Sequence, residues 1–279
     1  MATPSKPSEA MIFYDIAMRP PIASTCASPN PWKARFALNF KNIDYSTTWV
    51  PLPDIAQVRR TLGLDACRKF GDGTDFYTLP ILVDNNTNSK IGDSFDIAAY
   101  LESKYPNSGS GNLFPPQKLD FVYDEYPALL VPLSEQKQSE HEEYALFNTY
   151  VDAAFTVHVP LMGYNLPFDP ATAEASKAIF MQRAGLKSWD DFEVKGEMRE
   201  QMKDSFRVML GNLGKLFLRD TSGPFLLGQQ ASHADFIVGG WLRMACVTLP
   251  ENEWEEVRGW HGGIFGRLYD GLQKYMEVK

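Results

Sequence analysis

A dense cluster of residues that break helices and strands divides this chain into two parts of different character. Residues 105–118 contain three prolines, two glycines and several Asn and Ser residues, a density that does not suit a regular element. Before this cluster, strand-like apolar runs are interspersed with helical patterns, whereas after it only helical periodicity recurs. The sequence therefore predicts an α/β domain at residues 11–105, a linker at 106–117 and an all-helical domain at 118–279.

Periodicity also predicts the elements within each part. Alternating apolar residues at 43–50 indicate a strand with one buried face, and the prolines between residues 17 and 28 indicate a stiff, non-helical loop. The clearest helical pattern is at 197–218, and residues 235–247 are apolar enough for a helix buried on all sides. The other expected elements are strands at 11–16 and 76–84, a loop at 65–75, and helices at 31–42, 53–64, 95–104, 140–158 and 253–275.

Composition disfavours several classes of function. The chain has 279 residues and a net charge of −8, which argues against nucleic acid or an anionic membrane surface as its main partner. No apolar run approaches the ~20 residues that cross a bilayer. The three cysteines and four histidines show no disulfide framework and no metal spacing, so we expect no metal. Residues 1–10 are polar and rich in Pro and Ser, so we expect a disordered tail and a cytoplasmic protein.

A hydroxyl precedes one of the predicted helices in the stretch Ser-Pro-Asn-Pro-Trp-Lys-Ala-Arg, residues 28–35. Proline suits the first turn of a helix, where its missing N–H costs nothing. The free N–H groups and the positive end of the helix dipole favour an anion at this point. The Ser28 hydroxyl can therefore cap the helix or donate a hydrogen bond to a bound thiolate, and the stretch alone favours the cap.

Three further motifs follow in order along the chain. Pro80 lies near the start of a predicted strand, which suggests an edge, a bulge or a cis bond because proline cannot donate to a sheet. Asp93 and Ser94 open the next helix. Far downstream, Ser232 and Asp235 have the spacing of a capping box at the start of the apolar helix.

Together these motifs resemble the soluble glutathione transferases, which have a thioredoxin-like α/β domain followed by an all-α domain. Within that superfamily the chain is most similar to the fungal etherase-related (FuA) class of wood-decay fungi. The stretches that suggest this class are the insertion at 18–27, the Ser-Pro-Asn-Pro-Trp-Lys run, Phe-Tyr-Thr-Leu-Pro at 76–80 and Ser-Trp-Asp-Asp-Phe at 188–192.

The resemblance implies that Ser28 donates a hydrogen bond to the thiolate of glutathione and acts as the catalytic residue. Asn30, at the same helix start, could supply a second donor. Cys26 is the alternative, because some transferase classes use a cysteine near this position to reduce mixed disulfides. No second cysteine forms a Cys-x-x-Cys pattern with Cys26, so we expect a loop thiol.

The resemblance also implies how the rest of glutathione is held. A cis bond before Pro80 would turn the backbone of Leu79 outward to pair with the cysteinyl part, as at a sheet edge. Ser94, at a helix N-terminus, would bind the γ-glutamyl carboxylate, and Asp93 would pair with the ammonium group. Without the family, Asp-Ser before a helix is only a cap.

Two parts of the predicted site lack a clear motif. The glycine carboxylate of glutathione needs a cation, and Lys69 and its neighbour Arg68 are candidates, although their loop favours a solvated surface over a binding role. A second-substrate pocket is expected between the domains. Aromatic residues at helical spacing are usually core, but the candidates for its walls, beside the 18–27 loop, are Tyr14, Tyr150, Phe155 and Tyr164.

The leading interpretation is a serine-type glutathione transferase that uses glutathione as co-substrate and attacks hydrophobic or aromatic electrophiles. One alternative is glutathione-dependent ether cleavage, which needs the same thiolate. Another is a ligandin-like protein that binds aromatic wood compounds with little turnover. A purely structural role, known for this fold, is disfavoured by Ser28 and the Asp93–Ser94 pair. The family also leads us to expect a homodimer.

Overall fold

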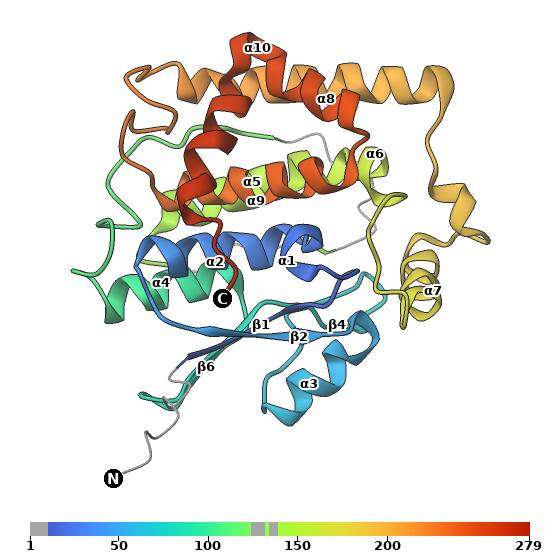
Figure 1. The fold of residues 1–279 in the computed structure, drawn as a ribbon, viewed down its shortest axis with the longest axis horizontal. Helices are drawn as coiled ribbons and strands as arrows, with labels where there is room; N and C mark the ends of the chain where they lie inside the picture. The colour runs from blue at the N-terminus through green and yellow to red at the C-terminus, as the bar shows by residue number, and fades with distance from the viewer. Residues whose placement is uncertain (1–10, 124–131, 134–138) are drawn as a thin grey trace.

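The computed structural model describes residues 11–123, 132–133 and 139–279. Its first domain contains a four-stranded mixed sheet in the order β2-β1-β5-β6. β1 is parallel to β2 and antiparallel to β5, which pairs antiparallel with β6. Helices α2 and α4 cover one face of this sheet and α3 covers the other (Figure 1). The bounds are β1 Met11–Ile16, α2 Pro29–Phe40, β2 Ser46–Val50, α3 Ile55–Thr61, β5 Ile81–Asp84, β6 Ser89–Ile91 and α4 Ser94–Lys104.

Among its described residues, the second domain contains helices joined by loops and no strand, so the fold class predicted from the sequence is confirmed. Helix α9 runs through its middle and is almost wholly buried, as its apolar sequence indicates. None of the helices in the described part of the chain is long and apolar enough to cross a membrane. The bounds are α5 Glu142–Val157, α6 Pro160–Gly163, α7 Ala173–Ala184, α8 Gly196–Phe217, α9 His233–Thr248 and α10 Glu251–Leu272.

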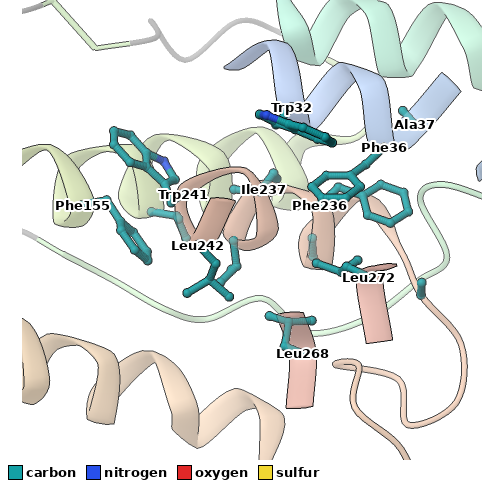
Figure 2. Packing of buried hydrophobic residues seen from close by; sticks show 14 of the residues in the cluster. Trp32, Phe36, Ala37, Phe155, Phe236, Ile237, Trp241, Leu242, Leu268 and Leu272 are labelled. Atoms are coloured by element: carbon teal, nitrogen blue, oxygen red, sulfur yellow. The ribbon is translucent and has the colours of Figure 1, made fainter. Parts of the chain in front are cut away.

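The two domains meet where α2 packs against α9. The ring of Phe36 stacks on that of Phe236, with centroids 5.6 Å apart, at the centre of the cluster in Figure 2. Gly240 lies against the start of α2, where an added Cβ would be 2.6 Å from the carbonyl oxygen of Pro29. Only glycine fits at this position, because such a contact would force the two backbones apart. The second domain thus supports the first turn of α2.

Three segments differ from the sequence-based expectation. The 17–28 loop contains one helical turn, α1 (Ile22–Thr25), because prolines exclude a helix interior but are tolerated before its first turn. The expected 65–75 loop contributes to a hairpin of β3 (Arg68–Lys69) and β4 (Asp75–Phe76), and the predicted 76–84 strand is interrupted before β5. Helix α7 was not expected, since its apolar residues do not line one face. The predicted tail, residues 1–10, lies outside the described residues.

Candidate active site

A cavity of about 220 Å³ lies between the two domains, and we call it the interdomain cavity. Its polar side is formed by the start of α2 and by the β3–β4 hairpin with the segment that follows it. The opposite walls are apolar and come mainly from the second domain. The polar lining residues are Ser28, Asn30, Arg68, Thr78, Thr156 and Arg183, and the aromatic ones are Phe76, Tyr77, Phe180, Trp189, Phe192 and Trp241.

Ser28 is the N-cap residue of α2, yet its side chain makes no capping hydrogen bond. An N-cap oxygen normally accepts from the N–H of the second or third helical residue. Of these two donors, Pro31 at the third position has no N–H, and the N–H of Asn30 at the second position makes no hydrogen bond to the Ser28 side chain. The hydroxyl of Ser28 therefore stays at the wall of the interdomain cavity, where it can donate to a ligand. The interpretation of Ser28 as a simple cap is not supported by this geometry.

Asn30 presents a second polar group at the same helix start. Its Oδ1 atom is buried and has no hydrogen-bond partner among the described residues, although the residue lines the interdomain cavity. Burying an amide oxygen without a partner is unfavourable by about 1–3 kcal/mol. A ligand that donates a hydrogen bond to this oxygen would remove that cost.

Cys26, the alternative working residue, lies in the core. Its side chain is 1% exposed, and burial together with the nearby Asp15 carboxylate raises the pKa of its thiol to about 11. Its carbonyl oxygen accepts a hydrogen bond of 2.7 Å from Trp32 Nε1. Since the thiolate is the reactive form of cysteine, this environment suits a structural thiol.

Asp93 caps helix α4 and lies close to the cavity wall. Its Oδ1 accepts a hydrogen bond of 2.8 Å from the N–H of Phe95, and its Oδ2 is 4.0 Å from Nη2 of Arg68. Ser94, the first residue of α4, is buried. Arg68 lines the cavity and also donates to the carbonyl oxygen of Pro132 at 2.6 Å. The predicted Asp93–Ser94 pair is therefore linked to the cavity through Arg68.

The Leu79–Pro80 peptide bond is cis, as the resemblance led us to expect. Leu79 is fully buried and lies between the hairpin and β5, outside the paired residues of the main sheet. Thr78, the residue before it, lines the interdomain cavity. This short backbone segment therefore forms part of the wall between Ser28 and Arg68.

Lys69 does not lie where the sequence-based prediction placed it. Its side chain is 69% exposed and forms an ion pair of 3.1 Å with Asp75 on the facing strand. Neighbouring residues of a strand point to opposite sides, so Arg68 faces the cavity and Lys69 faces solvent. Between the two candidates, the structure favours Arg68 as a cation for a bound carboxylate.

The four aromatic residues expected in the second-substrate pocket are not among those that line the cavity. Phe155 is fully buried and stacks on Trp241 at 5.4 Å, and the two rings lie side by side in Figure 2. Tyr164 stacks on Trp189 at 6.3 Å. Phe155 and Tyr164 therefore do not line the cavity themselves but pack against tryptophans that do. Tyr14 belongs to β1 and Tyr150 to α5, where each is half-buried against a core cluster.

A buried ionic network fixes one of these walls. Nζ of Lys33, on α2, is fully buried, forms an ion pair with Asp152 and donates to Oδ1 of Asn148 at 2.8 Å. Oδ1 of Asp152 also accepts a hydrogen bond of 2.7 Å from Nε1 of Trp241. Burial lowers the pKa of Lys33, and Asp152 opposes that change. The network ties α2, α5 and α9 together behind the cavity.

Comparison with known proteins agrees with this architecture. Residues 27–104 match the family model "Glutathione S-transferase, N-terminal domain", and residues 145–275 match "Glutathione S-transferase, C-terminal domain".

The chain belongs to the glutathione S-transferase family.

Three of the proteins that it resembles come from fungi. The glutathione S-transferase-like protein ustS of Aspergillus flavus is 26% identical, over 95% of this chain and 90% of that protein. GSTFuA3 of Phanerochaete chrysosporium is 26% identical with a TM-score of 0.78, covering 97% of this chain and 99% of that one. CsGST63524 of Ceriporiopsis subvermispora, solved in complex with glutathione, is 27% identical with a TM-score of 0.76 and the same coverage. The predicted resemblance to the FuA class is thus confirmed.

Sequence reasoning missed several residues of the transferase's cavity. Trp189 and Phe192 belong to the 188–192 stretch that suggested the family, but nothing in that stretch shows which cavity they line. Arg183, which lines the cavity, and Lys33, which lies behind its wall, are each in a helix without a local motif that signals burial. Among the residues that the structure describes, no cluster of three or more His, Cys, Asp and Glu side chains could hold a metal.

Proposed function

We propose that this transferase is of the serine type and that the Ser28 hydroxyl donates a hydrogen bond to the thiolate of bound glutathione. The observation that carries the proposal is that Ser28 begins α2, lines the interdomain cavity and makes no capping bond. A free thiol has a pKa near ~8.5, and a helix N-terminus with a donor can lower it to ~3.5–7.5. The thiolate would then be present at neutral pH.

The remaining contacts follow from the geometry around that serine. The N-terminus of α4, with Ser94 and Asp93, suits the carboxylate and ammonium of the γ-glutamyl group. The backbone around Leu79 suits the cysteinyl amide, and Oδ1 of Asn30 can accept a hydrogen bond from a glutathione N–H. A likeness to the glutathione-bound CsGST63524 of 27% identity supports the same ligand here.

The second substrate is proposed to be a hydrophobic or aromatic electrophile. The aromatic rings that line the cavity, Trp189 and Trp241 among them, support this class because they bury a flat apolar ligand well. The same walls would also hold an aromatic ligand without turnover, and the same thiolate would cleave an aryl ether. Assays of the pure protein with aryl halides, isothiocyanates, aryl ethers and plant phenolics separate these three outcomes.

The role of Ser28 is tested by measuring the pKa of the bound glutathione thiol from its ultraviolet thiolate absorbance. Ser28→Ala is expected to raise that pKa by about one unit, which corresponds to ~1.4 kcal/mol, a reasonable contribution for one charge-assisted hydrogen bond. Conjugation at neutral pH should fall by up to about tenfold, because the thiolate fraction falls, and should recover partly in alkaline buffer, where the thiol ionises unaided.

Cys26→Ser is the matched control and should leave the pH–rate profile unchanged. If Cys26→Ser instead abolished activity, and the native protein reduced mixed disulfides with glutathione, the enzyme would be a thiol transferase. The serine-type assignment would then be wrong.

A further inference from the structure

Arg183 lines the interdomain cavity and also a second cavity. The second cavity, which we call the outer cavity, has a volume of about 520 Å³ and lies between α7, the start of α3 and the β3–β4 hairpin. Four residues line both cavities, namely Leu52, Ile55, Tyr77 and Arg183. Arg183 is therefore a shared wall residue of the two cavities.

The guanidinium of Arg183 is held by aromatic rings and not by a carboxylate. Its Cζ atom lies 4.9 Å from the ring centroid of Phe76, 5.8 Å from that of Phe70 and 6.0 Å from that of Phe180. Within the part of the chain that the structure describes, Arg183 has no ion pair or hydrogen bond, and burial alone lowers its pKa. Arginine nevertheless stays protonated in proteins, so a positive charge lies at this wall.

Arg183 differs from Arg68, the other charged residue of the interdomain cavity, in having no carboxylate close to its guanidinium. Arg68 lies 4.0 Å from the carboxylate of Asp93, and no Asp or Glu is among the described lining residues of that cavity. In the outer cavity, Asp75 is bound by Lys69 and Tyr77 and Asp72 by Thr74, and neither carboxylate pairs with Arg183. In a chain of net charge −8, an unpaired cation at a cavity wall requires an explanation.

We propose that Arg183 is a specificity-determining residue that binds the carboxylate of an aromatic acid. A guanidinium held over aromatic rings keeps its N–H donors in its own plane, pointing away from its centre, where they can bind both oxygens of a carboxylate. The ring of the ligand would pack against Phe180 and Trp189, whose own rings are 6.4 Å apart. That the aromatic acid is the electrophile attacked by glutathione rests on the proposed transferase function. That the acid binds at Arg183 does not depend on it.

Glutathione is the other possible source of a carboxylate at Arg183. The observations favour the aromatic acid because the rings around the guanidinium match an aromatic body, which glutathione lacks. Glutathione also has Arg68 and the N-terminus of α4 available for its own charged ends. The experiment therefore measures binding of the two ligands separately.

The test is calorimetric titration of the full chain with 2-naphthoate and with 2-naphthamide, in the absence of glutathione. The two probes share a ring system and differ in charge at neutral pH. The native protein should bind naphthoate at least about tenfold more tightly, as expected for a charge-assisted, two-point contact. Arg183→Gln should remove that preference by weakening naphthoate alone. An unchanged affinity for naphthamide would show that the cavity of the variant is intact.

Arg60→Gln is the matched control, since Arg60 also stacks on an aromatic ring of the hairpin, 4.8 Å from the centroid of Tyr77, but is exposed and lines neither cavity. It should keep the preference for naphthoate. A native protein without any preference would overturn the proposal. So would an Arg183→Gln variant that binds naphthoate normally but loses affinity for glutathione. If glutathione bound to none of the proteins, the proposed function would fail, and the naphthoate titration would still decide the role of Arg183.

Discussion

Helices α2 and α9 pack against each other, and each begins after a serine, but the two serine hydroxyl groups differ in their hydrogen bonding. Ser232 is fully buried, and its Oγ donates to Asp235 at 2.9 Å and accepts from Gln117 at 3.0 Å. Ser28 makes no capping bond and lines the interdomain cavity. The same residue at the same helical position is thus structural in one helix and available to a ligand in the other.

The difference comes from the residues that follow each serine. After Ser232, the third helical residue is Asp235, whose carboxylate returns to the N–H of Ser232 at 2.8 Å. After Ser28, the third helical residue is Pro31, which can neither donate from its backbone nor accept from a side chain. A serine before a helix is therefore a candidate donor to a ligand where proline removes its usual partner.

The largest expected effect is on α9, where the carboxylate of Asp235 binds backbone N–H groups at the start of the helix. Asp235→Ala should lower the free energy of unfolding by about 3 kcal/mol or more, because it leaves the buried N–H groups of Leu226 and Ser232 without their acceptor. Denaturant titration measures the loss. Asp191→Ala is the control, since Asp191 accepts from Ser188 at 2.9 Å in an exposed turn. Equal losses in both variants would show that burial of the motif is unimportant.

The second effect is a pH dependence that comes from Asp235, at the start of α9. Burial raises the pKa of Asp235 to about 6, above its ordinary value of 3.8, so the folded state binds this proton more tightly than the unfolded state. The free energy of unfolding should therefore fall as pH rises from about 4 to about 6, by about 3 kcal/mol relative to Asp235→Asn, which cannot titrate. Denaturation of both proteins across that range measures it. A native protein whose free energy of unfolding rises relative to that of Asp235→Asn as the pH increases would contradict the assignment.

The smallest effect separates the two serines directly. Ser232→Ala should destabilise the fold by about 1 kcal/mol, the usual cost of removing an N-cap side chain, whereas Ser28→Ala should change stability by less than about 0.5 kcal/mol. Thermal unfolding of the two variants makes the comparison. If Ser28→Ala were as destabilising as Ser232→Ala, the Ser28 hydroxyl would be a cap, and its proposed role at the thiolate would lose its basis.

Elements with strong periodicity were predictable, and elements whose place depends on distant contacts were not. The helix expected at 197–218 is α8, Gly196–Phe217, because a long apolar stripe leaves little freedom in its bounds. Helix α7 and the β3–β4 hairpin carry no such stripe. Without the hairpin, alternation could not show that Arg68 faces the cavity and Lys69 faces solvent.

The candidate site was predicted best where a motif is local. Ser28 and Asn30 follow from one stretch of sequence, and both line the cavity. By contrast, Lys33 pairs with Asp152, 119 residues further along the chain, and no local pattern indicates that contact. The expected wall residue Phe155 lies on a helix whose buried face is easily recognised, but recognising a buried face does not show whether it meets a core or a cavity.

The contact between Gly240 and Pro29 has a consequence for how this enzyme can change over time. The residue that follows the proposed catalytic serine rests on a position in the other domain where a single methyl group would collide with its backbone. A substitution there would move Ser28 relative to Arg68 and Thr78 without altering any residue of the cavity. The two domains therefore cannot be exchanged independently between relatives. A second domain taken from another transferase would keep Ser28 in place only if it also carries glycine at the position of Gly240.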